Sequence, residues 1–229
     1  MNSLLRYKIT SKASVPGKDL GGNAFPLYGC PNAPSRPHHM TGELFPPAGF
    51  RYRDAVLSAE RERALVTAFE TLPLAPFEFH GYLGNRRVLS FGYRYDYAGR
   101  QLRESSVMPD FLLDLRETAG AFAESPSDSF RQALVTEYAP GAGIGWHRDK
   151  PMFGKVVAFS FLSACTLRFR RRDGARWERR SQRLEPRSAY ILEDVARWEW
   201  EHSIPAGDTL RYSVTFRDFV APDPSDAPE

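Results

Sequence analysis

A histidine and an aspartate lie two residues apart in the segment His147-Arg-Asp149. In an extended strand, residues i and i+2 project from the same face, so both side chains can approach one ion. A neutral imidazole and a carboxylate are both ligands for divalent transition metals. The pair therefore marks a candidate metal site, although such a pair alone arises by chance in many proteins.

His202 follows 53 residues after Asp149, in the sequence Trp-Glu-Trp-Glu-His-Ser. A lone histidine beside tryptophan is more often a core or surface residue than a ligand. With His147 and Asp149, however, it would complete a set of two histidines and one carboxylate. That set holds one face of an octahedral Fe(II) ion and leaves three positions open. Zinc with three protein ligands and a water is the main competing interpretation.

The segment RYSVTFR alternates polar and apolar residues strictly, with Arg211, Ser213, Thr215 and Arg217 on one face. A half-buried surface strand would show the same pattern. An arginine nine residues after a candidate ligand histidine is also placed to bind a carboxylate through two hydrogen bonds. The Cα atoms of the two arginines should lie about 20 Å apart. One is therefore expected to anchor the far carboxylate of an organic acid, and the other to lie nearer the metal or substrate.

The surrounding pattern predicts which elements position these residues. Ser58 can cap a helix that runs to about Leu72, and a second helix should begin near Pro109. The stretches 85–99 and 132–219 read mostly as strands, with hairpin turn signals between them. Because strands follow strands without long helices between them, the predicted fold is mainly β, of the α+β kind. We expect an antiparallel sandwich or jelly roll with the two helices packed on one side.

A chain of 229 residues with 42% apolar residues predicts one large domain or a domain with an extension. The proline-rich residues 1–48 are expected to form an irregular extension, residues 49–219 the domain, and residues 220–229 an acidic flexible tail. No apolar stretch is long enough for a membrane helix, and two cysteines exclude a disulfide scaffold. A cytoplasmic, monomeric protein is the expectation.

The net charge of +3 is unevenly distributed along the chain. Residues 168–187 contain nine arginines against three acidic residues. Such a cluster favours a polyanionic partner, but a solvated hairpin would explain it equally well.

The ordered combination of these segments resembles the AlkB family of 2-oxoglutarate- and Fe(II)-dependent dioxygenases over residues 48–219. The resemblance rests on YAPGA at 138–142, the His-x-Asp pair, His202, and RYSVTFR at 211–217, where the family has R-x-N-x-T-x-R. It implies a double-stranded β-helix (jelly-roll) core and a nucleotide-recognition lid within residues 85–97. The implied catalytic iron ligands are His147, Asp149 and His202. The residues implied to bind 2-oxoglutarate are Tyr138, Arg211, Ser213 and Arg217. The implied substrate contacts are Arg86, Arg87, Tyr93 and Tyr95.

The family resemblance implies oxidative demethylation of alkylated bases in DNA or RNA, using Fe(II), 2-oxoglutarate and O₂ and releasing succinate, CO₂ and formaldehyde. Alternative targets are a modified tRNA, a protein or a small molecule, and a non-catalytic jelly-roll module that binds nucleic acid is a further alternative. Three positions depart from the family pattern. Ser213 and Thr136 replace asparagines, and Pro151 occupies a position where repair members often have an acidic residue that contacts the damaged base.

Overall fold

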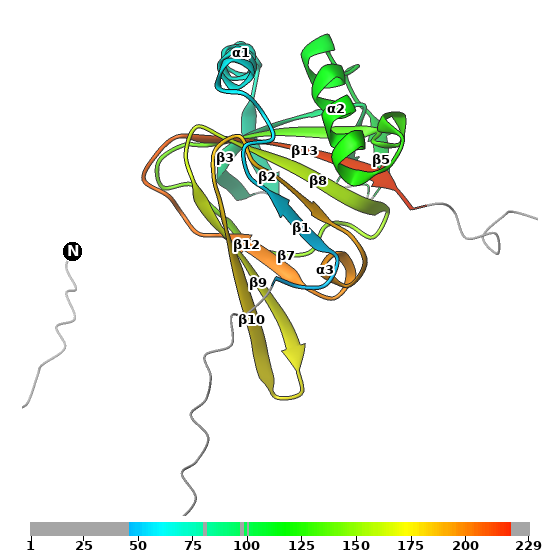
Figure 1. The fold of residues 1–229 in the computed structure, drawn as a ribbon, viewed down its shortest axis with the longest axis vertical. Helices are drawn as coiled ribbons and strands as arrows, with labels where there is room; N and C mark the ends of the chain where they lie inside the picture. Colours follow the sequence, from blue (N-terminus) through cyan, green and yellow to red (C-terminus); the bar gives the residue numbers. More distant parts are fainter. Residues whose placement is uncertain (1–45, 80–81, 97–98, 100, 221–229) are drawn as a thin grey trace, which may run out of the picture. The chain divides into compact units, whose positions relative to one another are not determined.

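Residues 46–79, 82–96, 99 and 101–220 are described by the structure, a computed structural model. The predictions for the N-terminal extension up to residue 45 and for the tail 221–229 lie outside these residues. The strands of the described part form two larger antiparallel sheets and a small hairpin (Figure 1). The predicted mainly β architecture is confirmed.

The larger sheet has seven strands in the order β1-β11-β8-β13-β6-β3-β2. Its strands are β1 (Phe50–Arg53), β2 (Ala75–Phe79), β3 (Tyr82–Phe91), β6 (Gln132–Tyr138), β8 (Phe153–Phe161), β11 (Ala189–Leu192) and β13 (Arg211–Phe219). The smaller sheet has the order β10-β9-β12-β7. Its strands are β7 (Ile144–His147), β9 (Cys165–Asp173), β10 (Arg176–Leu184) and β12 (Glu201–Ile204). The separate hairpin pairs β4 (Tyr93–Asp96) with β5 (Gln101–Glu104).

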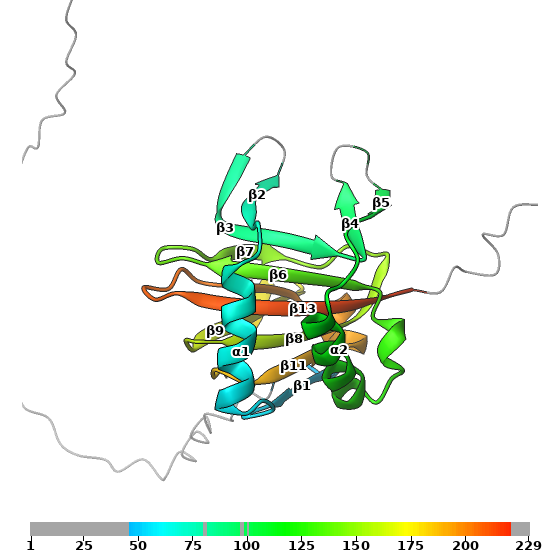
Figure 2. The same ribbon diagram turned by 90° about the horizontal axis from the view of Figure 1, so that it is seen from above.

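Two helices cover the outer face of the larger sheet (Figure 2). Helix α1 (Ala59–Glu70) starts where expected, because the Ser58 hydroxyl accepts a hydrogen bond from the backbone N–H of Arg61. Helix α2 (Asp110–Ala123) has Pro109 as its N-cap, one residue earlier than the expected first-turn position. Apolar side chains of both helices form one buried cluster with β6, β8 and β13.

A second apolar cluster fills the space between the two sheets. It joins residues of β8 and β11 to Leu167 and Phe169 of β9 and to Trp200. The sandwich therefore has a helix-side core and an inter-sheet core, and the larger sheet separates them. No helix in the described ranges is long and apolar enough to cross a membrane.

Several short elements were not predicted from the sequence. These are β1, β2, β5, β12, the helix α3 (Asp194–Trp198) and the 3₁₀ turn η1 (Ser127–Ser129). The stretch 85–99 also divides into β3 and β4 at Gly92, which has a φ of +72°. A Cβ at Gly92 would lie 2.1 Å from the carbonyl oxygen of Arg131, so glycine allows this sharp change of direction.

Candidate active site

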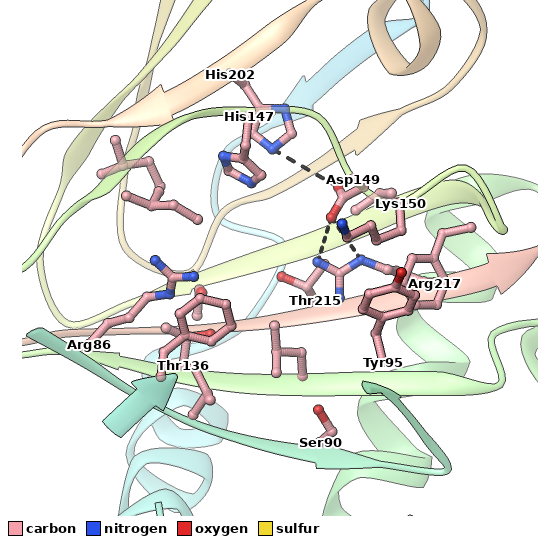
Figure 3. A pocket seen from close by; sticks show the side chains of 18 of the residues that line it. Arg86, Ser90, Tyr95, Thr136, His147, Asp149, Lys150, His202, Thr215 and Arg217 are labelled. Carbon is pink, nitrogen blue, oxygen red and sulfur yellow. Dashed lines mark hydrogen bonds and ion pairs between the residues drawn. The ribbon is translucent and has the colours of Figure 1, made fainter. Parts of the chain in front are cut away.

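The three candidate metal ligands lie together at one end of the smaller sheet. His147 of β7 and His202 of β12 are direct antiparallel partners, and their ring centroids are 4.3 Å apart. Asp149 follows β7, and its Oδ2 lies 4.0 Å from Nε2 of His202 (Figure 3). Strand pairing therefore brings together two histidines that are 55 positions apart in the sequence.

Arg217 holds the carboxylate of Asp149 in place. Its Nη2 and Nε donate to Asp149 Oδ1 at 2.9 and 3.2 Å, and its Nη1 donates to Gln132 Oε1 at 2.9 Å. Burial works to raise the pKa of Asp149, but the charge of Arg217 outweighs it and holds that pKa below the usual range. The carboxylate is therefore ionised, as a metal ligand must be.

Both histidines are kept neutral by their surroundings. Burial lowers the pKa of His202 to about 3. Burial also lowers the pKa of His147, against the opposing charge of Asp149. Nδ1 of His147 lies 2.9 Å from the carbonyl oxygen of Gly145. A proton on Nδ1 would satisfy that carbonyl and leave Nε2 as the ligand atom.

The polar face of β13 lines the same cavity, and its apolar face packs toward the helices. Arg211, Ser213, Thr215 and Arg217 are among the lining residues, and Tyr212, Val214 and Phe216 belong to the helix-side core. The alternation expected from the sequence therefore separates cavity from core along this strand. Leu210, which directly precedes β13, is exposed.

Arg211 lies near the other end of β13, opposite Tyr138 of β6. Its guanidinium packs over the Tyr138 ring at 4.9 Å, and its Nε donates to the Ser160 hydroxyl at 3.0 Å. Nη1 is buried and has no hydrogen-bond partner among the described residues. A buried guanidinium N–H without a partner is costly, so this end of the cavity fits a carboxylate ligand.

Among the described residues, no three His, Cys, Asp or Glu side chains are arranged to hold a metal ion as they stand. Cis donors of an octahedral ion lie about 3 Å apart at metal bonds of about 2.1 Å. The 4.0 Å between His202 and Asp149 must therefore shorten by about 1 Å on binding. The donor types and their protonation fit Fe(II), and closing the distance between His202 and Asp149 is a side-chain movement.

The cavity has a volume of about 860 Å³ and reaches from these ligands to β3 and β4, which contain most of the predicted lid segment 85–97. Of the four expected substrate contacts, Arg86 and Tyr95 line it. The other two are engaged elsewhere: Arg87 donates to Glu137 and to the carbonyl oxygen of Leu74. Tyr93 accepts a hydrogen bond from Arg131 and packs edge-on against Phe219.

Sequence reasoning missed several residues of this cavity. Gln132 extends the pocket-facing alternation of β6, which continues through Thr136 to Tyr138, so the period of two could have found it. Lys150 lines the cavity, and its ammonium lies 4.8 Å from the Tyr95 ring centroid. Tyr190 lines it from β11, a strand too uniformly apolar to mark one face.

A mainly β sandwich with two histidines and one carboxylate, and with an arginine near each end of a cavity-lining strand, is typical of the jelly-roll oxygenases. The family model described as 2OG-Fe(II) oxygenase superfamily matches residues 61–217. The chain belongs to this superfamily and is AlkB-like within it. Membership implies Fe(II), 2-oxoglutarate and O₂ as metal, co-substrate and oxidant.

The relatives support the AlkB-like assignment. An Arabidopsis thaliana protein described as alkylated DNA repair protein ALKBH8 homolog is 28% identical over 192 residues, covering 72% of this chain and 53% of the relative. A Danio rerio protein described as probable RNA/DNA demethylase ALKBH6 is 30% identical over 122 residues, covering 53% of this chain and 49% of the relative. The chain thus spans about half the length of these curated relatives.

The solved structure titled "The structure of OsALKBH1" matches with a TM-score of 0.58 and 16% identity. The match covers 76% of this chain and 98% of that one. At this identity the likeness shows the fold alone, and it confirms the predicted AlkB-like jelly roll.

Proposed function

We propose that this chain oxidatively demethylates alkylated bases of DNA or RNA. The observation that carries the proposal is one cavity that joins His147, Asp149 and His202 to a buried arginine with a free N–H. Fe(II), together with 2-oxoglutarate and O₂, would supply the chemistry that hydroxylates the N-methyl group. One oxygen atom enters succinate, formed with CO₂, and the other enters the N-methyl group, which then leaves as formaldehyde.

Different residues of the chain bind the metal and 2-oxoglutarate. Neutral His147 and His202 and ionised Asp149 offer three ligand atoms on one side of the metal, leaving positions for the co-substrate and oxidant. Arg211 binds the far carboxylate of 2-oxoglutarate with its unpartnered Nη1, while Ser160 and Tyr138 fix the direction of its guanidinium. Arg217, which donates to Asp149, would lie next to the carboxylate and keto group of 2-oxoglutarate near the metal.

The lid side of the cavity provides the contacts for a base. Arg86 and Tyr95 line this side, and Lys150 lies next to Tyr95. A ring such as Tyr95 stacks on any base, and cationic groups attract the neighbouring phosphates. A base can enter this cavity only from a single strand or after flipping out of a duplex. The two relatives, described as an alkylated DNA repair protein homolog and a probable RNA/DNA demethylase, support the same substrate class.

The residue at position 151, Pro151, decides which methylated bases should be tested as substrates. It is exposed and does not line the cavity, so no acidic side chain from this position meets the base. A panel of matched DNA and RNA oligonucleotides should therefore carry both cationic and neutral methylated bases. We expect the Fe(II)-loaded protein to release formaldehyde from at least one member, with an equal amount of succinate. Succinate formation without formaldehyde from any member would refute demethylation and leave hydroxylation of another target.

A further inference from the structure

We propose that the outer face of the smaller sheet is a second nucleic-acid-binding surface, which holds the phosphate backbone beside the base in the cavity. This inference rests on the proposed function. The surface, called here the arginine platform, consists of Arg168, Arg170 and Arg172 of β9, Trp177 and Arg179 of β10, and Trp146 of β7. Strands β9 and β10 extend away from the rest of the sandwich (Figure 1).

Strand register places these side chains on one face. Arg172 pairs with Trp177, and Arg170 pairs with Arg179. Directly opposed residues of antiparallel strands share a face. The intervening Phe169 pairs with His202 and belongs to the inter-sheet core, so the platform faces away from the interior.

Two tryptophans alternate with the arginines along this face. Arg168 and Arg170 lie over the Trp146 ring at 5.1 and 4.6 Å. Arg170 and Arg172 lie over the Trp177 ring at 4.3 and 4.2 Å. Stacking restrains each guanidinium in a flat orientation, so less rotamer entropy is lost when its N–H groups bind an anion.

Charge on the two faces of this hairpin differs. On the inner face, Arg171 is bound by Glu178 and Glu199, and Arg180 by Glu178. On the platform, Glu201 binds Arg170. Arg168, Arg172 and Arg179 have no ion pair with a carboxylate in the described ranges. The uncompensated positive charge of the hairpin therefore gathers on one face.

The spacing and position of the platform favour a nucleic-acid backbone. Alternate residues of β9 repeat about every 6.6 Å, comparable to the spacing of successive phosphates in an extended strand. The guanidinium fork matches a phosphate with two hydrogen bonds. Trp146 both stacks under Arg168 and Arg170 and lines the cavity, so the platform continues from the catalytic site. A strand whose base occupies the cavity can thus continue over Trp146 onto the platform.

Fluorescence anisotropy with fluorescently labelled single strands of 20 nucleotides that carry no methylated base tests this surface without requiring turnover. RNA and DNA strands of one sequence distinguish the two sources of the backbone. The variant R172Q/R179Q removes two exposed cations that have no carboxylate partner in the described chain. We expect its Kd to rise about tenfold. The slope of the logarithm of the association constant against the logarithm of the salt concentration should become less steep by about 1.4. W177A keeps the charge but frees two guanidinium groups, and its Kd should also rise.

The matched control is R53Q/R63Q, which removes the same charge at two exposed sites outside the hairpin. Its Kd should stay within twofold of wild type. An R172Q/R179Q affinity no weaker than that of the control overturns the platform. Displacement of the oligonucleotide by poly-glutamate at equal charge concentration also overturns it, because the face would then fit acidic proteins equally well. The two proposals can fail separately. If R172Q/R179Q loses nucleic-acid binding but no methylated oligonucleotide yields formaldehyde with the wild-type protein, demethylation is refuted and the arginine platform is supported.

Discussion

Replacing Arg197 by methionine should destabilise the domain and loosen the loop that carries Asp149. Arg197 is only 3% exposed. Its Nη2 donates to the carbonyl oxygens of Lys150 at 2.7 Å and Phe153 at 2.6 Å, and its Nε donates to that of Gly154 at 2.9 Å. One side chain of α3 therefore fixes the whole connection between Asp149 and β8.

The magnitude follows from these three hydrogen bonds. A hydrogen bond from a charged donor contributes about 1.5–3 kcal/mol. Desolvation of the guanidinium, which also lowers the pKa of Arg197, offsets part of the sum. Methionine keeps much of the apolar stem. We expect the free energy of unfolding to fall by about 3–5 kcal/mol, or Tm by roughly 6–20 °C for a domain of this size.

Urea denaturation followed by circular dichroism measures this loss, with Arg63→Met on the exposed face of α1 as the control. Metal affinity should fall about tenfold or more in Arg197→Met, since Asp149 loses its support. A stability loss below about 1 kcal/mol, or unchanged metal affinity in the folded variant, would refute this role of Arg197.

Three further changes have defined outcomes. Asp149→Ala should abolish succinate formation because it removes the one carboxylate of the ligand set, and turnover at the wild-type rate would contradict the assignment. Phe159→Ala should lower the free energy of unfolding by about 3–5 kcal/mol, because Phe159 is fully buried against the helices, and a denaturation midpoint equal to wild type would disprove this packing. Between about pH 6.5 and 3, His202 is protonated in the unfolded chain but stays neutral in the folded protein. The free energy of unfolding should therefore fall as the pH drops through this window. His202→Gln should make the stability-against-pH curve shallower there, and an equally steep curve would show that His202 does not contribute.

The sequence predicted the elements that carry strong local signals. Ser58 marks the start of α1, and the alternation in β13 separates cavity side chains from core side chains. His147, Asp149 and His202 could be proposed as a set because their residue types and order are unusual in combination. Their convergence depends on the pairing of β7 with β12, and β12 is too short to be recognised from its own four residues.

Other features depended on tertiary contacts that leave no local pattern. Arg87 has the residue type of a phosphate contact, but Glu137 and the Leu74 carbonyl bind it in the fold. The clustered arginines of residues 168–187 could be a solvated hairpin or a binding face. Strand register resolves them into an inner, paired set and an outer, stacked set.

Anaerobic equilibrium binding of Fe(II) and 2-oxoglutarate to the full chain tests the proposed centre most directly. We expect one Fe(II) per chain, and tighter 2-oxoglutarate binding when the metal is present. Arg211→Met should weaken 2-oxoglutarate binding about tenfold or more while metal affinity stays within twofold, whereas His202→Ala should weaken both. Full metal occupancy in His202→Ala, or 2-oxoglutarate affinity indifferent to both the metal and Arg211, would contradict the assignment of this cavity as the catalytic centre.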